Sequence, residues 1–209
     1  ICHPELAEGS PMWVTAAATG ECPKGYPAGA LARVVVFCKT GPMANLKTIE
    51  IYTDGACSPN PGPGGYGLII LQDGSKRVLS GGFRNTTNNR MEIMAALVGL
   101  REIQSEAGEK VTIYSDSRYL VNMYGGGYAA KWRANGWRLA NKQPALNVDL
   151  WDELLQLAHG GVTFEWVRGH NEHAENEQCD ALAVSARLEE DLPPDTGYEA
   201  PRSPMASEQ

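Results

Sequence analysis

The order of strand-like and helix-like segments is the feature that most constrains the fold of this chain. Residues 47–54 alternate apolar and polar side chains, which is the period of a β-strand. Two further strands, 65–72 and 76–84, are predicted on either side of Asp73-Gly74, a dipeptide typical of a tight hairpin turn. We therefore expect three consecutive strands from residue 47 onward.

Helices and strands follow one another over the rest of the chain. We predict helices at 88–107, 117–124, 148–159 and 174–189, and strands at 110–116 and 162–168. Three consecutive strands followed by helical crossovers predict an α/β fold, with a five-stranded mixed sheet flanked by helices. In such folds, ligand sites lie near the carboxyl ends of the parallel strands.

Four acidic residues lie in or beside these apolar segments, where an ionised carboxylate is costly without a cation. They are Asp54, Glu92, Asp116 and Asp180. Asp54 and Asp116 each end a predicted strand, whereas Glu92 and Asp180 lie on helix faces of small and apolar residues. A single such acid could be a helix-edge charge that reaches water, but four on converging elements favour one shared site. Carboxylate oxygens suit Mg²⁺ or Mn²⁺.

The charge of the chain is unevenly distributed. A net charge of −7 argues at first against a nucleic-acid partner, because phosphate binding relies on Lys and Arg. Between Asp116 and Asp149, however, the sequence contains no acidic residue. This stretch carries basic residues among aromatic ones, namely Arg118, Lys131, Arg133, Arg138 and Lys142 with Tyr128, Trp132 and Trp137. It predicts a local basic patch on an acidic protein.

Cysteine content and hydropathy exclude several other classes of protein. The five cysteines are an odd number and form no C-x-x-C pair, so neither a disulfide framework nor a zinc site is indicated. No apolar run approaches the roughly 20 residues that cross a bilayer, and the first residues lack the layout of a secretory signal. We therefore expect a cytoplasmic protein with no membrane partner.

Six motifs together closely resemble type I ribonuclease H, the bacterial ribonuclease HI family. They are TDGACSPNPGPGGYG, TTNNRMEIMAA, SDSRYLV, GWRLANKQPALNVDLW, FEWVRGH and ENEQCDALA. The resemblance runs from about Met43 to Tyr198 and implies an RNase H-like fold. It also implies an endonuclease that hydrolyses the RNA strand of an RNA-DNA hybrid duplex with two Mg²⁺ ions, for which Mn²⁺ can substitute, giving 5′-phosphate and 3′-hydroxyl ends.

The resemblance assigns roles to the acids and to one histidine. Asp54 would bridge both metal ions, and Glu92, Asp116 and Asp180 would complete the cage. His170 corresponds to the mobile loop histidine of the family, which assists proton transfer or product release. The alternative for His170 is an incidental loop imidazole.

Substrate contacts also follow from the resemblance. The matching residues are Gly55, Cys57, Asn60, Thr87, Asn88, Asn89, Arg118, Trp132, Arg133, Trp137, Arg138 and Asn176. Asn60 and Thr87 match a phosphate pocket that senses the DNA strand, and residues 124–146 match a substrate handle. Trp132 and Trp137 could instead be packing residues. Arg118 departs from the family pattern, in which glutamine is frequent at this position.

The domain organisation that we predict has three parts. Residues 1–42 begin with Ile1, hold three of the five cysteines and show one short apolar run, Ala32–Phe37. We interpret them as an N-terminal extension, flexible or outside the catalytic domain, of the kind that a mis-assigned or fragmentary gene start produces. The alternative is a genuine small module. The ribonuclease H catalytic domain would span 43–198, with a flexible tail over 199–209, and we expect a monomer.

Two other classes of protein are compatible with parts of the pattern. One is a nucleic-acid-binding module with a decayed active site, which the retention of all four acids disfavours. The other is an RNase H-like domain with different chemistry, such as an integrase or the nuclease part of a reverse transcriptase. The hybrid-specific motifs argue against this second alternative.

Overall fold

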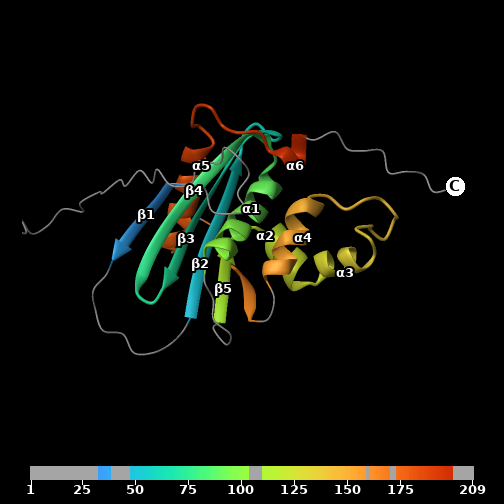
Figure 1. Cartoon of the computed structure of the whole chain (residues 1–209), viewed down its shortest axis with the longest axis horizontal. Helices are drawn as coiled ribbons and strands as arrows, with labels where there is room; N and C mark the ends of the chain where they lie inside the picture. Colours follow the sequence, from blue (N-terminus) through green and yellow to red (C-terminus); the bar gives the residue numbers. More distant parts are fainter. Residues whose placement is uncertain (1–32, 39–47, 104–109, 159–160, 170–172, 200–209) are drawn as a thin grey trace, which may run out of the picture.

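A mixed β-sheet forms the centre of the molecule (Figure 1). The computed structural model describes residues 33–38, 48–103, 110–158, 161–169 and 173–199. The strands are β1 (Arg33–Cys38), β2 (Thr48–Cys57), β3 (Gly62–Gln72), β4 (Ser75–Thr86), β5 (Lys110–Ser115) and β6 (Val162–Trp166). The helices are α1 (Asn88–Glu102), α2 (Arg118–Gly125), α3 (Tyr128–Ala134), α4 (Val148–Leu157), α5 (Ala174–Ala186) and α6 (Thr196–Glu199).

The five predicted strands are confirmed as β2 to β6. In the described part of the chain the strand order is β1-β4-β3-β2-β5-β6, with β2, β3 and β4 antiparallel and with β5 and β6 parallel to β2. Asp73 and Gly74, with φ of 50° and 74°, close the predicted hairpin between β3 and β4. Positive φ at both central residues is the geometry of a two-residue turn that matches the strand twist.

Strand β1 adds a sixth strand at the edge of the sheet. It pairs antiparallel with β4, from Arg33 opposite Ser80 to Cys38 opposite Ser75. This strand lies within residues 1–42, the segment that we interpreted as an extension. The domain boundaries at 42 and 198 stay a prediction.

Helices cover both faces of the sheet. Helix α1 lies on one face between the sheet and α4, and it is buried continuously from Arg90 to Leu100. The main core forms here, with fully buried Ile51, Leu68 and Trp151 among its members. Each fully buried aliphatic side chain contributes about 1.5–3 kcal/mol relative to exposure. No helix of the described segments is both long and apolar enough to span a bilayer.

Helix α5 packs on the opposite face of the sheet, against β3 and β2 (Figure 1). Glycines in β3 allow the helix backbone to approach closely, because a Cβ on Gly67 would overlap the carbonyl oxygen of Cys179. The two layers therefore bring α1 and α5 to either side of β2. The acidic residues that these three elements carry are placed around one strand.

Candidate active site

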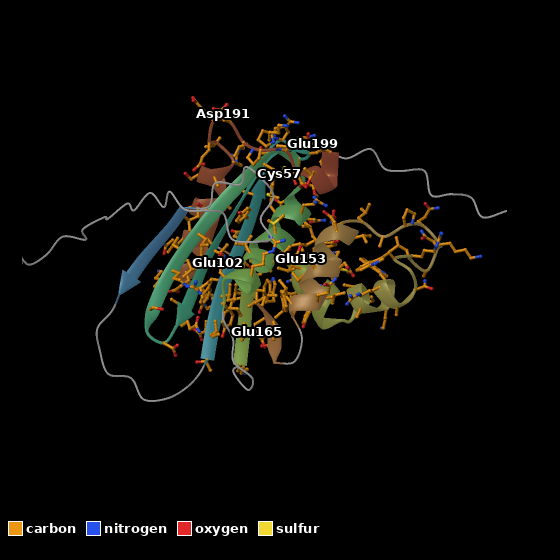
Figure 2. The ribbon with its side chains drawn as sticks, in the orientation of Figure 1. Cys57, Glu102, Glu153, Glu165, Asp191 and Glu199 are labelled. Carbon is orange, nitrogen blue, oxygen red and sulfur yellow. The ribbon has the colours of Figure 1, made fainter. Side chains whose placement is uncertain are left out.

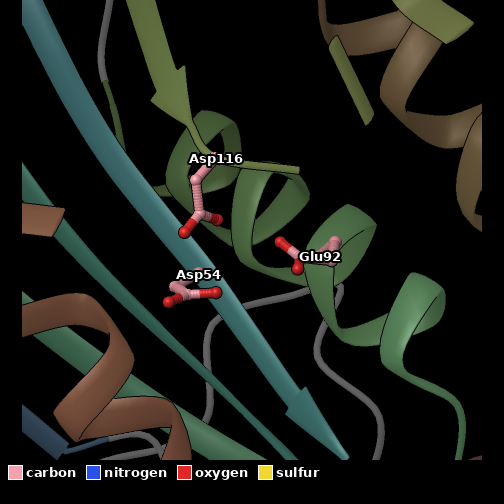
Figure 3. Close-up of side chains that lie close together, drawn as sticks. All are labelled: Asp54, Glu92 and Asp116. Carbon is pink, nitrogen blue, oxygen red and sulfur yellow. The ribbon is translucent and has the colours of Figure 1, made fainter. Parts of the chain in front are cut away.

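Three of the predicted acids meet at the carboxyl end of two neighbouring parallel strands (Figure 3). Asp54 lies in β2, and Asp116 directly follows β5, whose last residue Ser115 pairs with Thr53. Glu92 reaches the same point from the first turns of α1. One carboxylate oxygen from each acid lies within 4.8 Å of the others. Asp54 is 7% exposed and Glu92 5%, so these two carboxylates are largely shielded from water, whereas Asp116 is partly exposed.

Asp180 lies on α5 and does not belong to this close group of described residues. Its charge nevertheless acts on Asp54. Burial raises the pKa of Asp54 to about 7, and the charges of Asp116 and then Asp180 add to the rise, whereas a 2.7 Å hydrogen bond from the Gly55 N–H opposes it. The structure thus brings three of the four acids together and leaves Asp180 as a nearby fourth charge.

The surroundings of Glu92 disfavour its charged form. Its burial, followed by the charges of Asp54 and Asp116, raises its pKa well above the ordinary value. Asn88 Nδ2 donates a hydrogen bond to Oε1 of Glu92 at 3.3 Å, but Oε2 is buried without a hydrogen-bond partner among the described residues. A buried carboxylate oxygen without a donor is costly. A hard divalent cation, which prefers oxygen ligands, fits this donor set.

Two glycines make room for the acids. A Cβ on Gly55 would overlap the backbone nitrogen of Glu92 and would lie 2.6 Å from the carbonyl carbon of Met91, so glycine lets α1 rest directly on β2. A Cβ on Gly169 would overlap Oδ2 of Asp116. Glu92 and Asp116 can therefore hold their positions only because residues 55 and 169 are glycines.

Hydrogen bonds join Asn60, one of the two predicted phosphate-pocket residues, to Asn88 and Cys57 beside Glu92. Asn88 Oδ1 accepts from the Cys57 N–H at 3.1 Å, and the Asn88 N–H donates to Asn60 Oδ1 at 3.3 Å. Thr87 caps α1, because its Oγ1 accepts from the Arg90 N–H at 3.4 Å. Asn89, adjacent to these residues, is exposed at the surface. The network connects the loop between β2 and β3 to the start of α1.

The predicted handle, residues 124–146, contains the end of α2 and all of α3, and α3 lies on the side of the molecule away from β1 (Figure 1). Trp137 is partly buried against the main core, which favours the packing alternative for this residue, and Trp132 is half-buried. Arg133 is exposed but its Nε lies 2.9 Å from Oδ1 of Asp152. Arg138 is exposed, and its Nη1 donates only to the Lys142 carbonyl oxygen at 3.3 Å among the contacts seen. The two arginines therefore differ in their freedom to meet a phosphate.

A cation–π pair of Arg118 and Trp166 lies beside Asp116 and was not predicted from the sequence. The Arg118 guanidinium lies 4.8 Å from the ring centroid of Trp166, and the Trp166 indole N–H donates to the Asp116 carbonyl oxygen at 3.1 Å. Trp166 is 42% exposed. The signal in the sequence was the tryptophan in the FEWVRGH motif, near the end of a predicted strand. His170, the last residue of the same motif, lies outside the described residues.

Comparison with known proteins agrees with this fold and site. The family model described as RNase H matches residues 46–187. Ribonuclease H of Desulforamulus reducens is 54% identical over 157 residues, which cover 75% of this chain and 98% of the relative. Ribonuclease HI of Synechocystis is 51% identical over 141 residues, 66% of this chain and 87% of the relative.

A solved structure gives the same result for the fold. LC9-RNase H1, described as a type 1 RNase H with the type 2 active-site motif, superposes with a TM-score of 0.59 at 29% identity, covering 70% of this chain and 74% of that one. A mixed sheet flanked by helices, with a cluster of acids near the carboxyl ends of two parallel strands, thus defines the class as an RNase H fold. The chain belongs to the ribonuclease H family, of type I, and it is an enzyme.

Proposed function

We propose that the protein hydrolyses the RNA strand of RNA-DNA hybrids endonucleolytically, using two divalent metal ions, normally Mg²⁺. The observation that carries this proposal is the close group of Asp54, Glu92 and Asp116, in which the buried Oε2 of Glu92 has no hydrogen-bond partner among the described residues. These residues would hold a cation, and Asp180 would contribute a fourth carboxylate. Bound ions would supply activation of the attacking water and stabilisation of the leaving 3′ oxygen.

Residues of the chain would orient the substrate around this group. Asn60, Thr87 and Asn88 offer amide and hydroxyl groups for a phosphate, and Gly55 and Cys57, which follow Asp54 in β2, would contact the RNA 2′-hydroxyl groups. Contacts of this kind carry little base information, so cleavage is expected to be largely independent of sequence. The basic residues after α2 would follow the DNA strand. His170, as the loop histidine, stays a prediction.

The bond changes of the proposed reaction balance without a further reactant. Water adds to the phosphorus atom, the bond from phosphorus to the 3′ oxygen breaks, and the 3′ oxygen takes up a proton. The products would carry 5′-phosphate and 3′-hydroxyl ends. The cytoplasmic location and the monomeric state expected from the sequence stay predictions.

One assay tests the proposed function. The protein is incubated with a labelled RNA strand in an RNA-DNA hybrid, in duplex RNA and as single strand, and with labelled duplex DNA, each with MgCl₂ or with EDTA. We expect Mg²⁺-dependent cleavage of the hybrid alone, with products that phosphatase treatment shifts on a gel. The Asp54→Asn variant is the matched control and should fold but not cleave. Equal cleavage of duplex DNA, or full activity of Asp54→Asn, would contradict the proposal.

A further inference from the structure

Arg90 is a buried cation held by two carboxylates at the start of α1. Its side chain is 3% exposed. Nη1 and Nη2 donate to Oδ1 and Oδ2 of Asp149 at 2.9 and 2.6 Å, and Nε and Nη2 donate to Oδ2 and Oδ1 of Asp195 at 2.7 and 2.8 Å. A planar guanidinium that is bidentate to two carboxylates has a fixed position and orientation. We call Arg90, Asp149 and Asp195 the Arg90 clamp.

The clamp joins parts of the chain that are distant in sequence. Asp149 lies in the first turn of α4, directly after the predicted handle, and Asp195 precedes α6. Oδ2 of Asp195 also accepts from Thr86 Oγ1, at the end of β4, at 2.6 Å. The start of α1 is thus tied to β4, to α4 and to the segment before α6 at a single point.

The clamp lies on the side of α1 opposite the acid group. Successive helical residues are about 100° apart, so the side chains of Arg90 and Glu92 point in roughly opposite directions. On the Glu92 side the helix rests on β2, through the close approach at Gly55 and the hydrogen bond between Asn88 and Cys57. The first turn of α1 is therefore held between β2 in front and the clamp behind.

We propose that Arg90 is a positioning residue for the metal site, which acts through Asp149 and Asp195 to fix the turn of α1 that carries Asn88 and Glu92. This inference rests on the proposed function. With the clamp intact, the backbone that carries Glu92 has a fixed position, and the Glu92 carboxylate already lies beside Asp54 and Asp116. A divalent cation therefore binds to a site that is already assembled.

The chain contains a matched control for this idea. Arg101 and Glu153 form a second bidentate pair between α1 and α4, with Nε to Oε1 at 2.7 Å and Nη2 to Oε2 at 2.6 Å. Arg101 lies nine residues after Glu92, about 14 Å along the helix, whereas Arg90 is two residues from it. Figure 2 shows Glu153 apart from Cys57, which lies three residues after Asp54 in β2. A purely stabilising role would change the stability at both pairs but the Mg²⁺ affinity at neither.

The test compares Arg90→Lys with Arg101→Lys in the full chain. Each variant keeps the positive charge but loses the planar guanidinium that bonds a carboxylate through two N–H groups. We expect both to lower the midpoint of thermal unfolding, Arg90→Lys by more, because its partner Asp195 is buried whereas Glu153 is partly exposed. Only Arg90→Lys should weaken Mg²⁺ binding, measured by calorimetry without substrate, by about three- to tenfold, and speed amide hydrogen exchange at residues 88–92. Its KM for hybrid should rise more than its kcat falls. Asp195→Asn serves as the second variant if Arg90→Lys does not fold.

The outcomes separate this inference from the proposed function. If both variants lose stability but Arg90→Lys binds Mg²⁺ as the wild type does, Arg90 is structural only and the positioning role is wrong. If Arg90→Lys weakens Mg²⁺ binding while the wild type cleaves no hybrid, the positioning role stands and the proposed function fails.

Discussion

Asn176 on α5 donates a hydrogen bond from Nδ2 to Oδ2 of Asp116 at 3.4 Å, across the edge of the acid group. Asn176 is 2% exposed, and its Oδ1 is buried without a partner among the described residues. The same Asp116 oxygen faces Gly169, where a Cβ would overlap it. Gly169 and Asn176 therefore both restrict Oδ2 of the Asp116 carboxylate.

Replacing Asn176 tests whether this restriction matters for turnover. Asn176→Asp keeps the size of the side chain but adds a negative charge beside Asp116, whereas Asn176→Ala removes the donor. We expect both to lower kcat at least about tenfold, because outer contacts orient metal ligands. Raising the Mg²⁺ concentration should rescue Asn176→Asp in part, since extra metal offsets the extra charge. Steady-state kinetics over a Mg²⁺ series would show unchanged kcat if Asn176 had no such role.

The stability of the metal-free protein should fall as pH rises from about 4 to about 7. Asp54 binds its proton more tightly in the folded state, with a pKa of about 7 against 3.8, and Glu92 shifts in the same direction. The folded state thus holds more protons in this window, and the loss can reach a few kcal/mol by pH 8. Above pH 7, Mg²⁺ should restore stability.

Urea unfolding in EDTA at pH 5 and pH 8 measures this effect. The isosteric Asp54→Asn variant is the control, because it removes one of the titrating groups and should lose less stability between the two values. If the metal-free wild-type protein were equally stable at pH 5 and pH 8, the pKa values of Asp54 and Glu92 would not be raised in the folded state.

The two exposed arginines of the predicted handle should contribute unequally to substrate binding. Arg133 is paired with Asp152, whereas Arg138 contacts only a backbone carbonyl oxygen in the described structure. We expect Arg138→Ala to raise KM for hybrid and to lower the salt slope of binding by about one, with Arg133→Ala having the smaller effect. Binding titrations from 50 to 200 mM KCl measure both. Identical behaviour of the two variants would contradict this ranking.

Much of the fold followed from local pattern. The alternation over 47–54 and the Asp73-Gly74 turn predicted β2 and the β3–β4 hairpin, because period-two side chains and turn residues act over a few neighbours. The helix at 128–134 was missed. Three glycines, Gly125 to Gly127, break the helical pattern before it, and Gly127 has a left-handed φ of 66°.

The site was predictable only in part, for a physical reason. The convergence of Asp54 and Asp116 followed from two parallel strand ends, a rule of sheet topology. The partners of Arg90 lie 59 and 105 residues away, and nothing in local spacing identifies them. The same holds for the distance of Asp180 from the acid group, which depends on how α5 packs on β3.

Metal placement tests the central claim most directly. Crystals of the protein soaked in MnCl₂ would be measured at a wavelength where Mn²⁺ scatters anomalously. We predict a peak within about 2.5 Å of a carboxylate oxygen of each of Asp54, Glu92 and Asp116, and its loss in Asp54→Asn. An anomalous map with no peak among these three residues, from crystals in which the acids are ordered, would contradict the account.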